Sequence, residues 1–121
     1  MKIDERNLKV MRYMENTTIY PRTKEYIINT LYDIIELQNG KLILSDAVRG
    51  IVYYKVSMYG YEWELMYTVT EIQGQTRWSA PDGPGSREGK SSVTIRIIGE
   101  RRENEKEMRR ALALLESMLN L

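Results

Sequence analysis

Two glutamates, Glu62 and Glu64, are the side chains whose spacing most directly suggests chemistry. They occupy alternate positions of a segment that reads as a β-strand, which places both carboxylates on one face, roughly 7 Å apart. Paired carboxylates at such a distance can act as acid and base in glycoside hydrolysis. Lys55 is expected opposite Glu64 on the neighbouring strand. A solvent-exposed salt pair therefore explains these residues better than an active site does.

A phosphate-binding loop is suggested by residues 85–91, which read GSREGKS. The P-loop motif has four residues between its first glycine and the Gly-Lys-Ser or Gly-Lys-Thr, and this chain has Pro84 at the position of that glycine. A strand is expected to follow, so the amide donors of a helix N-terminus are missing. We interpret residues 81–89 as a loop rich in glycine and proline.

Residues 49–56, RGIVYYKV, partly match the RNA-contacting strand of RRM domains. Arg49, Gly50 and Tyr53 agree with that motif, whereas Ile51 and Val56 stand where it has aromatic residues. The charge of the chain is nearly balanced, with 18 basic and 17 acidic side chains. This balance argues against nucleic acid as a partner, so single-stranded nucleic-acid binding is kept only as a third hypothesis.

The composition removes several kinds of chemistry, because the chain has no cysteine and no histidine. Disulfides, zinc–thiolate sites and the commonest general base are therefore excluded. We predict no catalytic residues, no metal site and no cofactor, and hence that the chain is not an enzyme. Residues 1–121 are expected to form one domain. No segment has the apolar length of a membrane span, so we expect no membrane contact and a cytoplasmic location.

Residues 51–69 predict a β-hairpin around Tyr59-Gly60. Its register places one apolar or aromatic face toward a core, and a one-residue slip would mix that face with the polar one. The cross-strand pairs expected on the core face are Met58 with Tyr61, Val56 with Trp63, Tyr54 with Leu65 and Val52 with Tyr67. Those expected on the outer face are Ser57 with Glu62, Lys55 with Glu64, Tyr53 with Met66 and Ile51 with Thr68.

The rest of the chain supplies two helices and further strands. Apolar residues at helical spacing predict a helix over about 21–38, with Pro21 in its first turn, and a long C-terminal helix over about 103–120. Asn104 is expected to cap this second helix, with Glu107 three residues further on. The strands are expected at 16–20, 41–44, 51–58, 61–69 and 92–98, and residues 1–15 are expected to be a loose or helical lead-in.

A second tight turn is expected at Gln73-Gly74, which would pair Val69 with Trp78 on the apolar face. Together with the first hairpin, this turn predicts an antiparallel meander. The fold class is therefore α+β: a curved antiparallel β-meander, packed on one face by the helices at about 21–38 and 103–120.

This order of elements resembles that of the small helix-grip domains, the START-like and TBP-like α+β folds. The resemblance rests on the order over residues 16–120, on the turn from Asp46 to Gly50-Ile51 and on the long terminal helix. It implies a site for apolar ligands between the sheet and the terminal helix. In this chain bulky aromatic side chains would line that site: Tyr54, Trp63, Tyr67 and Trp78.

The outer face of the sheet carries a second candidate site, because apolar residues interrupt it. These residues would form a patch for a protein partner or a second subunit: Ile51, Tyr53, Tyr59, Met66 and Ile98. The first hypothesis is therefore a non-catalytic binding or interaction module that dimerises through this patch. The second hypothesis is a carrier of a small apolar ligand, bound in the aromatic cleft.

Overall fold

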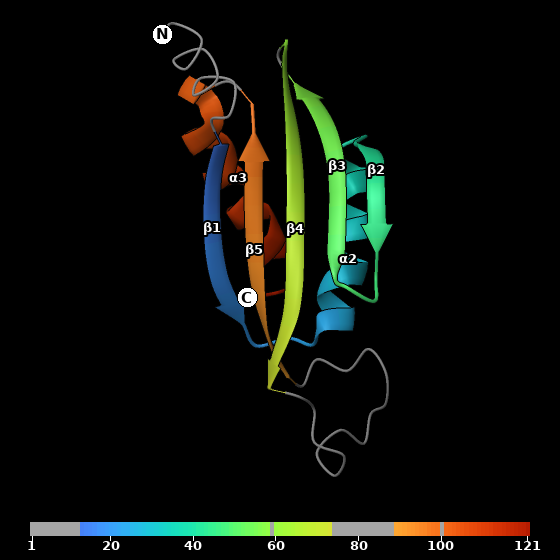
Figure 1. Cartoon of the computed structure of the whole chain (residues 1–121). Helices are drawn as coiled ribbons and strands as arrows, with labels where there is room; N and C mark the ends of the chain where they lie inside the picture. Colours follow the sequence, from blue (N-terminus) through green and yellow to red (C-terminus); the bar gives the residue numbers. More distant parts are fainter. Residues whose placement is uncertain (1–12, 59, 74–88, 100) are drawn as a thin grey trace, which may run out of the picture.

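The computed structural model describes residues 13–58, 60–73, 89–99 and 101–121. Its strands are β1 (Tyr13–Tyr20), β2 (Lys41–Asp46), β3 (Ile51–Met58), β4 (Tyr61–Gln73) and β5 (Lys90–Ile98), and its helices are α2 (Lys24–Leu37) and α3 (Arg101–Met118). The strands form one antiparallel sheet in the order β1-β5-β4-β3-β2. Both helices lie behind the sheet in Figure 1. The predicted α+β class, with two helices on one face, is confirmed.

The β3–β4 hairpin has the predicted register at every position. Val56 pairs with Trp63 and Val52 with Tyr67, and the outer face pairs Lys55 with Glu64. Six residues of the inner face are buried, and the pair next to the turn is not, since Met58 is half-buried and Tyr61 is exposed; the buried six are Val52, Tyr54, Val56, Trp63, Leu65 and Tyr67. Alternation of apolar and polar residues therefore determined this part of the sheet.

The predicted second turn at Gln73-Gly74 is wrong, because β4 continues to Gln73 and its other edge is taken by β5. Val69 pairs with Val93, and not with Trp78. A strand has two edges for pairing, and β3 and β5 occupy both edges of β4. Trp78 lies outside the described residues.

The N-terminal lead-in expected over residues 1–15 is wrong for its last three residues, and residues 1–12 lie outside the described part of the chain. The first strand begins at Tyr13, where it pairs with Ile98. Met14 pairs with Ile97 and packs against the core. Strand pairing with β5 therefore decides the conformation of residues 13–15.

Helix α2 begins three residues later than predicted, because Thr23 and not the region of Pro21 supplies its N-cap. The hydroxyl of Thr23 accepts a hydrogen bond from the amide of Tyr26 at 3.1 Å. This bond satisfies one of the amide groups that the first turn leaves without a partner. Ile27 and Leu31 are fully buried, so the face of the helix that carries them packs on the sheet.

Gly50 joins the β2–β3 turn to the centre of the sheet. It has a φ of 79°, and its carbonyl accepts a hydrogen bond from the amide of Val69 at 2.7 Å. In the same turn the amide of Gly50 donates to the carbonyl of Asp46 at 2.8 Å. The turn is therefore held at both ends by backbone bonds.

The core lies between the sheet and the two helices. Its buried apolar residues come from the inner face of four strands, from both helices and from Leu119 just beyond α3: Tyr20, Ile27, Ile28, Leu31, Ile34, Ile35, Val52, Tyr54, Val56, Trp63, Leu65, Tyr67, Val69, Val93, Ile95, Ile97, Met108, Ala111, Leu115 and Leu119. In the described ranges, neither helix is long and apolar enough to cross a membrane.

Candidate functional site

Helix α3 carries two polar side chains into the core, Asn104 and Glu107, and both residues are buried. The indole nitrogen Nε1 of Trp63 donates a hydrogen bond to Oδ1 of Asn104 at 3.2 Å. Asn104 thus lies within the helix and faces the sheet, so the predicted cap at this residue is wrong. The helix begins at Arg101 instead.

Glu107 is a buried carboxylate that is only half satisfied. The guanidinium of Arg110 donates to its Oε1, and Arg110 also donates from Nη1 to the sulfur of Met58 at 2.9 Å. Oε2 of Glu107 is buried and has no hydrogen-bond partner among the described residues. Burying a charged acceptor without a partner is costly, and such groups are rare in folded proteins. This oxygen is therefore the chemically most unusual atom of the described core.

Two stacked tyrosines, Tyr54 and Tyr67, lie in the same core as Asn104 and Glu107. The rings of Tyr54 and Tyr67 have centroids 6.0 Å apart and are nearly parallel. The hydroxyl of Tyr54 donates to Oε1 of Gln38 at 2.8 Å. Burial raises the pKa of Tyr54 to about 12; a hydrogen bond with Tyr67 opposes this shift, and the charge of Glu107 adds to it. We call Tyr54, Trp63, Tyr67, Asn104 and Glu107 the inner polar cluster.

The inner polar cluster contains three of the four residues predicted to line a ligand cleft: Tyr54, Trp63 and Tyr67. Sequence reasoning missed Asn104 and Glu107, which it took for a helix cap. A signal was available, because Asn104, Glu107, Ala111 and Leu115 follow one another at spacings of three and four residues and so share a helix face. A carboxylate with a free oxygen among aromatic rings can accept a hydrogen bond or a proton from a bound molecule.

The buried tyrosines predict a loss of stability at high pH. Burial raises the pKa of Tyr67 well above its ordinary value, and the pKa of Tyr54 to about 12. Phenols of the unfolded chain ionise near pH ~10. The unfolded state therefore releases protons before the folded state does, and the stabilisation present below pH ~10 is lost as pH rises toward about 12.

We expect the free energy of unfolding by urea to fall across this range. The fall should be smaller in Tyr54→Phe, which removes one of the phenols whose pKa is raised in the folded protein. The absorbance of tyrosinate, followed against pH in the folded protein, measures the pKa values of the phenols directly. If all nine tyrosines titrate together near pH ~10, the environment described for Tyr54 and Tyr67 is incorrect.

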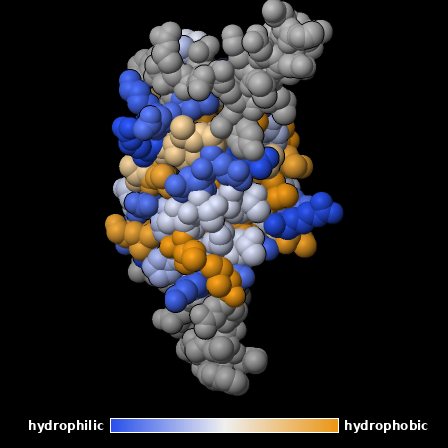
Figure 2. Space-filling view, turned by 60° about the vertical axis from the view of Figure 1, so that its left-hand side comes forward, coloured by the Kyte–Doolittle hydropathy of each residue, from blue (hydrophilic) through white to orange (hydrophobic). Residues whose placement is uncertain are grey.

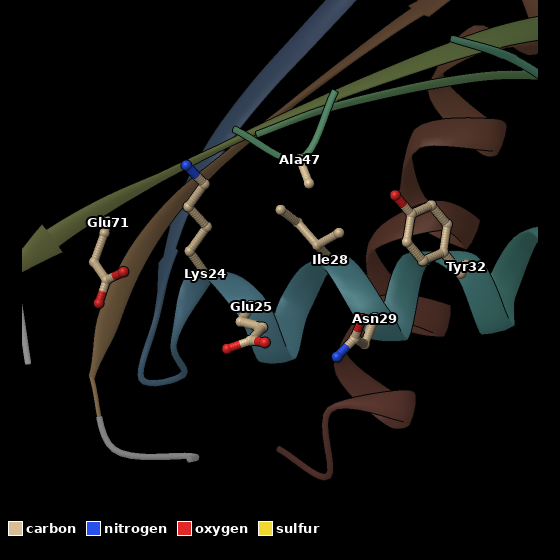
Figure 3. Close-up of a pocket in the computed structure, with 7 residues that line it drawn as sticks. All are labelled: Lys24, Glu25, Ile28, Asn29, Tyr32, Ala47 and Glu71. Atoms are coloured by element: carbon tan, nitrogen blue, oxygen red, sulfur yellow. The ribbon is translucent and has the colours of Figure 1, made fainter. Parts of the chain in front are cut away.

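A separate surface pocket of about 380 Å³ lies between α2 and the β2–β3 turn (Figure 3). Most of its residues come from α2, and the other two from the turn and from β4: Lys24, Glu25, Ile28, Asn29, Tyr32, Ala47 and Glu71. Two side-chain bonds tie this turn region to the helix. Nζ of Lys24 donates to the carbonyl of Val48 at 2.8 Å, and the hydroxyls of Tyr32 and Ser45 are hydrogen-bonded.

Glu62 and Glu64 make separate contacts, and Lys55 forms its salt bridge with Glu62 and not with Glu64 as expected. Nζ of Lys55 lies 3.9 Å from Oε2 of Glu62, on the solvent side of the sheet. Glu64 instead accepts a hydrogen bond from the hydroxyl of Tyr53. The P-loop-like segment lies mostly outside the described residues. Within the described residues, no group of three or more acidic side chains is placed to hold a metal ion.

The predicted partner patch lies on the outer face of the sheet. Tyr53 is directly opposite Met66, and Ile51 lies further along β3; all three are half-buried. Ile98 is opposite Glu64, so a carboxylate lies beside it. Tyr59 lies outside the described residues. The structure thus places all four described residues on the outer face, with Ile98 one row from Tyr53 and Met66 and two rows from Ile51.

Comparison with known proteins identifies the fold. No protein-family model matches the chain, and no curated protein matches it. The chain is similar to a solved structure, the di-domain ARO/CYC BexL from the BE-7585A biosynthetic pathway, with 11% identity and a TM-score of 0.61 over 92% of this chain. It spans 47% of the length of BexL. It is also similar to DR_A0006 of Deinococcus radiodurans, with 12% identity and a TM-score of 0.51, over 91% of this chain and 100% of that one.

These similarities agree with an α+β fold of the helix-grip type. They contradict the prediction that the chain is not an enzyme, because a protein with this fold is named as an aromatase/cyclase. That prediction rested on residue types alone. The absence of histidine and cysteine does not remove the chemistry available to a carboxylate such as Glu107.

Proposed function

We propose that this protein binds a small organic molecule in the layer between the sheet and α3. The observation that carries the proposal is the free Oε2 of Glu107, which is buried on the same helix as Asn104, the hydrogen-bond partner of Trp63. The likeness in fold to BexL supports a ligand-binding module of the START-like helix-grip kind. A cytoplasmic location stays a prediction.

The physical reason is the cost of this carboxylate to the fold. An apolar residue at position 107 would pack on the sheet without desolvating a charge, and such replacements are often neutral or stabilising. Groups that reduce stability in this way are concentrated at functional sites. We therefore infer that Glu107 binds a molecule that donates a hydrogen bond to its free oxygen.

The surrounding groups define the class of this molecule. A carboxylate oxygen only accepts, so the ligand must offer a hydroxyl or an amino group. Trp63, Tyr54 and Tyr67 offer aromatic surface, which favours flat, apolar rings. A phenol-bearing aromatic compound therefore fits the inner polar cluster best.

The test compares two probes that differ by one hydroxyl, 2-naphthol and naphthalene. Calorimetry should detect 2-naphthol binding, and Glu107→Gln should weaken it by about tenfold or more, because a hydrogen bond to a charged group is lost. Naphthalene binding should change little. Glu105→Gln on the exposed side of the same helix, where Glu105 pairs with Arg109, is the matched control.

Two results would contradict this proposal. One is the absence of 2-naphthol binding. The other is equal binding by the Glu107→Gln and Glu105→Gln variants, which would mean that the buried carboxylate does not contact the hydroxyl.

The other hypotheses stay predictions. Dimerisation through the outer patch is tested by measuring the mass of a Tyr53→Ser, Met66→Ser variant in solution. Single-stranded nucleic-acid binding needs exposed aromatic rings for stacking on bases. The buried positions of Tyr54, Trp63 and Tyr67 give it no support.

A further inference from the structure

The edge strand β2 exposes three consecutive large apolar side chains. Leu42, Ile43 and Leu44 are 48%, 45% and 49% exposed. Among the described residues, β2 pairs with β3 alone, so the backbone groups of its other edge face outward. Natural edge strands are usually protected by charge, proline or cover, because an open apolar edge pairs with other chains.

The opposite edge strand, β1, is different in character. On the outer face of the sheet, β1 makes a salt bridge from Glu15 to Arg96 of β5, with 3.3 Å between the charged atoms, and a hydrogen bond from Thr17 to Thr94 of β5. Figure 2 views the molecule turned toward this side, and hydrophobic atoms form separate small groups between pale and blue ones. The two edges are therefore unequal: β2 exposes three consecutive large apolar side chains, whereas β1 exposes a single one among its described side chains, Ile19, at 58%.

We propose that β2 is the interface with a second copy of this chain, which pairs with it antiparallel about a two-fold axis. The two sheets then form one continuous sheet. The sequence of β2, KLILSD, is complementary to itself in one register. That register places Lys41 opposite Asp46 of the partner subunit and, by symmetry, the partner's Lys41 opposite Asp46. One pair of opposite charges thus lies at each end of the interface, with apolar side chains between the two pairs.

A bulge in β2 makes this register geometrically consistent. Residues directly opposite each other on paired strands must face the same side of the sheet. Lys41 and Asp46 are an odd number of positions apart, so in a regular strand they would face opposite sides. The register shift between Leu42 and Leu44 corrects this. Lys41 pairs with Lys55 and Asp46 with Ile51, two residues that share the outer face of β3.

Strand β2 is also fixed to the rest of its own subunit before a partner binds. The hydroxyls of Tyr32 and Ser45 join β2 to α2, and Lys24 binds the carbonyl of Val48 in the following turn. A strand that is already ordered loses little conformational entropy when it pairs. β2 therefore presents a preformed edge.

Sedimentation of the full chain at concentrations up to about 1 mM tests the proposal, since a weak association is detected there. We expect twice the mass of the 14.2 kDa chain. Lys41→Glu should weaken the dimer by about tenfold, because it places two pairs of like charges together. Lys41→Glu combined with Asp46→Lys should restore it. Lys90→Glu, which alters an exposed lysine on β5 away from this edge, should have no such effect.

Asp46 also accepts a hydrogen bond from the amide of Arg49, and its Oδ2 lies 3.7 Å from Nε of the same residue, so Asp46→Lys is checked for folding by circular dichroism. Ile43→Lys keeps that turn intact and should also give a monomer. The proposal is overturned by a wild-type monomer at the highest concentration, or by a dimer that persists in Ile43→Lys. It is likewise overturned if the Tyr53→Ser, Met66→Ser variant, and not Ile43→Lys, is the monomer.

Discussion

Gly50→Ala is expected to destabilise the protein by about 3 kcal/mol or more, the largest effect of any single methyl group added to the described part of the chain. A Cβ atom at Gly50 would lie 2.1 Å from the carbonyl oxygen of Val69. The obstacle is backbone at the centre of the sheet, so it cannot move aside as a side chain would. The hydrogen bond from the amide of Val69 to Gly50 would be lost as well.

Gly60→Ala is the matched control for this prediction. Gly60 has a φ of 82°, almost the same as the 79° of Gly50, and no described atom lies within 4 Å of a Cβ added there. Its cost should be about 1 kcal/mol, the cost of a left-handed backbone alone. Urea unfolding of both variants gives the comparison. Equal losses at Gly50 and Gly60 would show that the close approach to Val69 is incorrect.

Arg110→Met is expected to cost about 2 kcal/mol, because it leaves the buried carboxylate of Glu107 without its partner. The value is below that for a fully buried ion pair, since the side chain of Arg110 is 39% exposed. Adding Glu107→Met to this variant should recover the wild-type stability or exceed it, since the double variant removes the charge and fills its place with an apolar group.

The double-mutant cycle is measured by urea unfolding, with Arg109→Met as the control on the same helix. Arg109 pairs with Glu105 at the surface, and its replacement should change the stability by less than about 0.5 kcal/mol. If Arg110→Met behaves like Arg109→Met, Glu107 is hydrated. A hydrated carboxylate needs no ligand to complete its hydrogen bonds, so this result would contradict the proposed function.

The register of the β3–β4 hairpin was predictable because the residues that determine it lie close together in the chain. Val56 and Trp63 are joined by a short turn, and a slip by one residue would expose the whole apolar set. The pairing of Val69 with Val93 was not predictable in this way. An alternating apolar residue, Trp78, lies closer in the chain, and alternation cannot distinguish a near partner from a distant one.

The candidate site was predicted on the strands and missed on the helix. Tyr54, Trp63 and Tyr67 follow a period of two, which assigns their face directly. Asn104 and Glu107 fit two interpretations, since the same spacing describes a helix cap and an inward face. Only the start of α3 at Arg101 decides between them.

The exposure of β2 was missed for another reason. The apolar run of Leu42, Ile43 and Leu44 predicts a strand. Whether that strand lies at an edge depends on the order of strands in the sheet. That order follows from which distant segments pair, and so it is a property of the whole chain.

The pairing of β1 with β5 has a consequence for the order of folding. Thr17 and Thr94, which share a hydrogen bond, are separated by 77 positions in the chain. Closing so long a segment is slow, whereas the β3–β4 hairpin needs only neighbouring residues. We therefore expect the sheet to grow outward from that hairpin and β1 to join it last. Until then β5 has an open edge, and the nascent chain depends on β1 to close it.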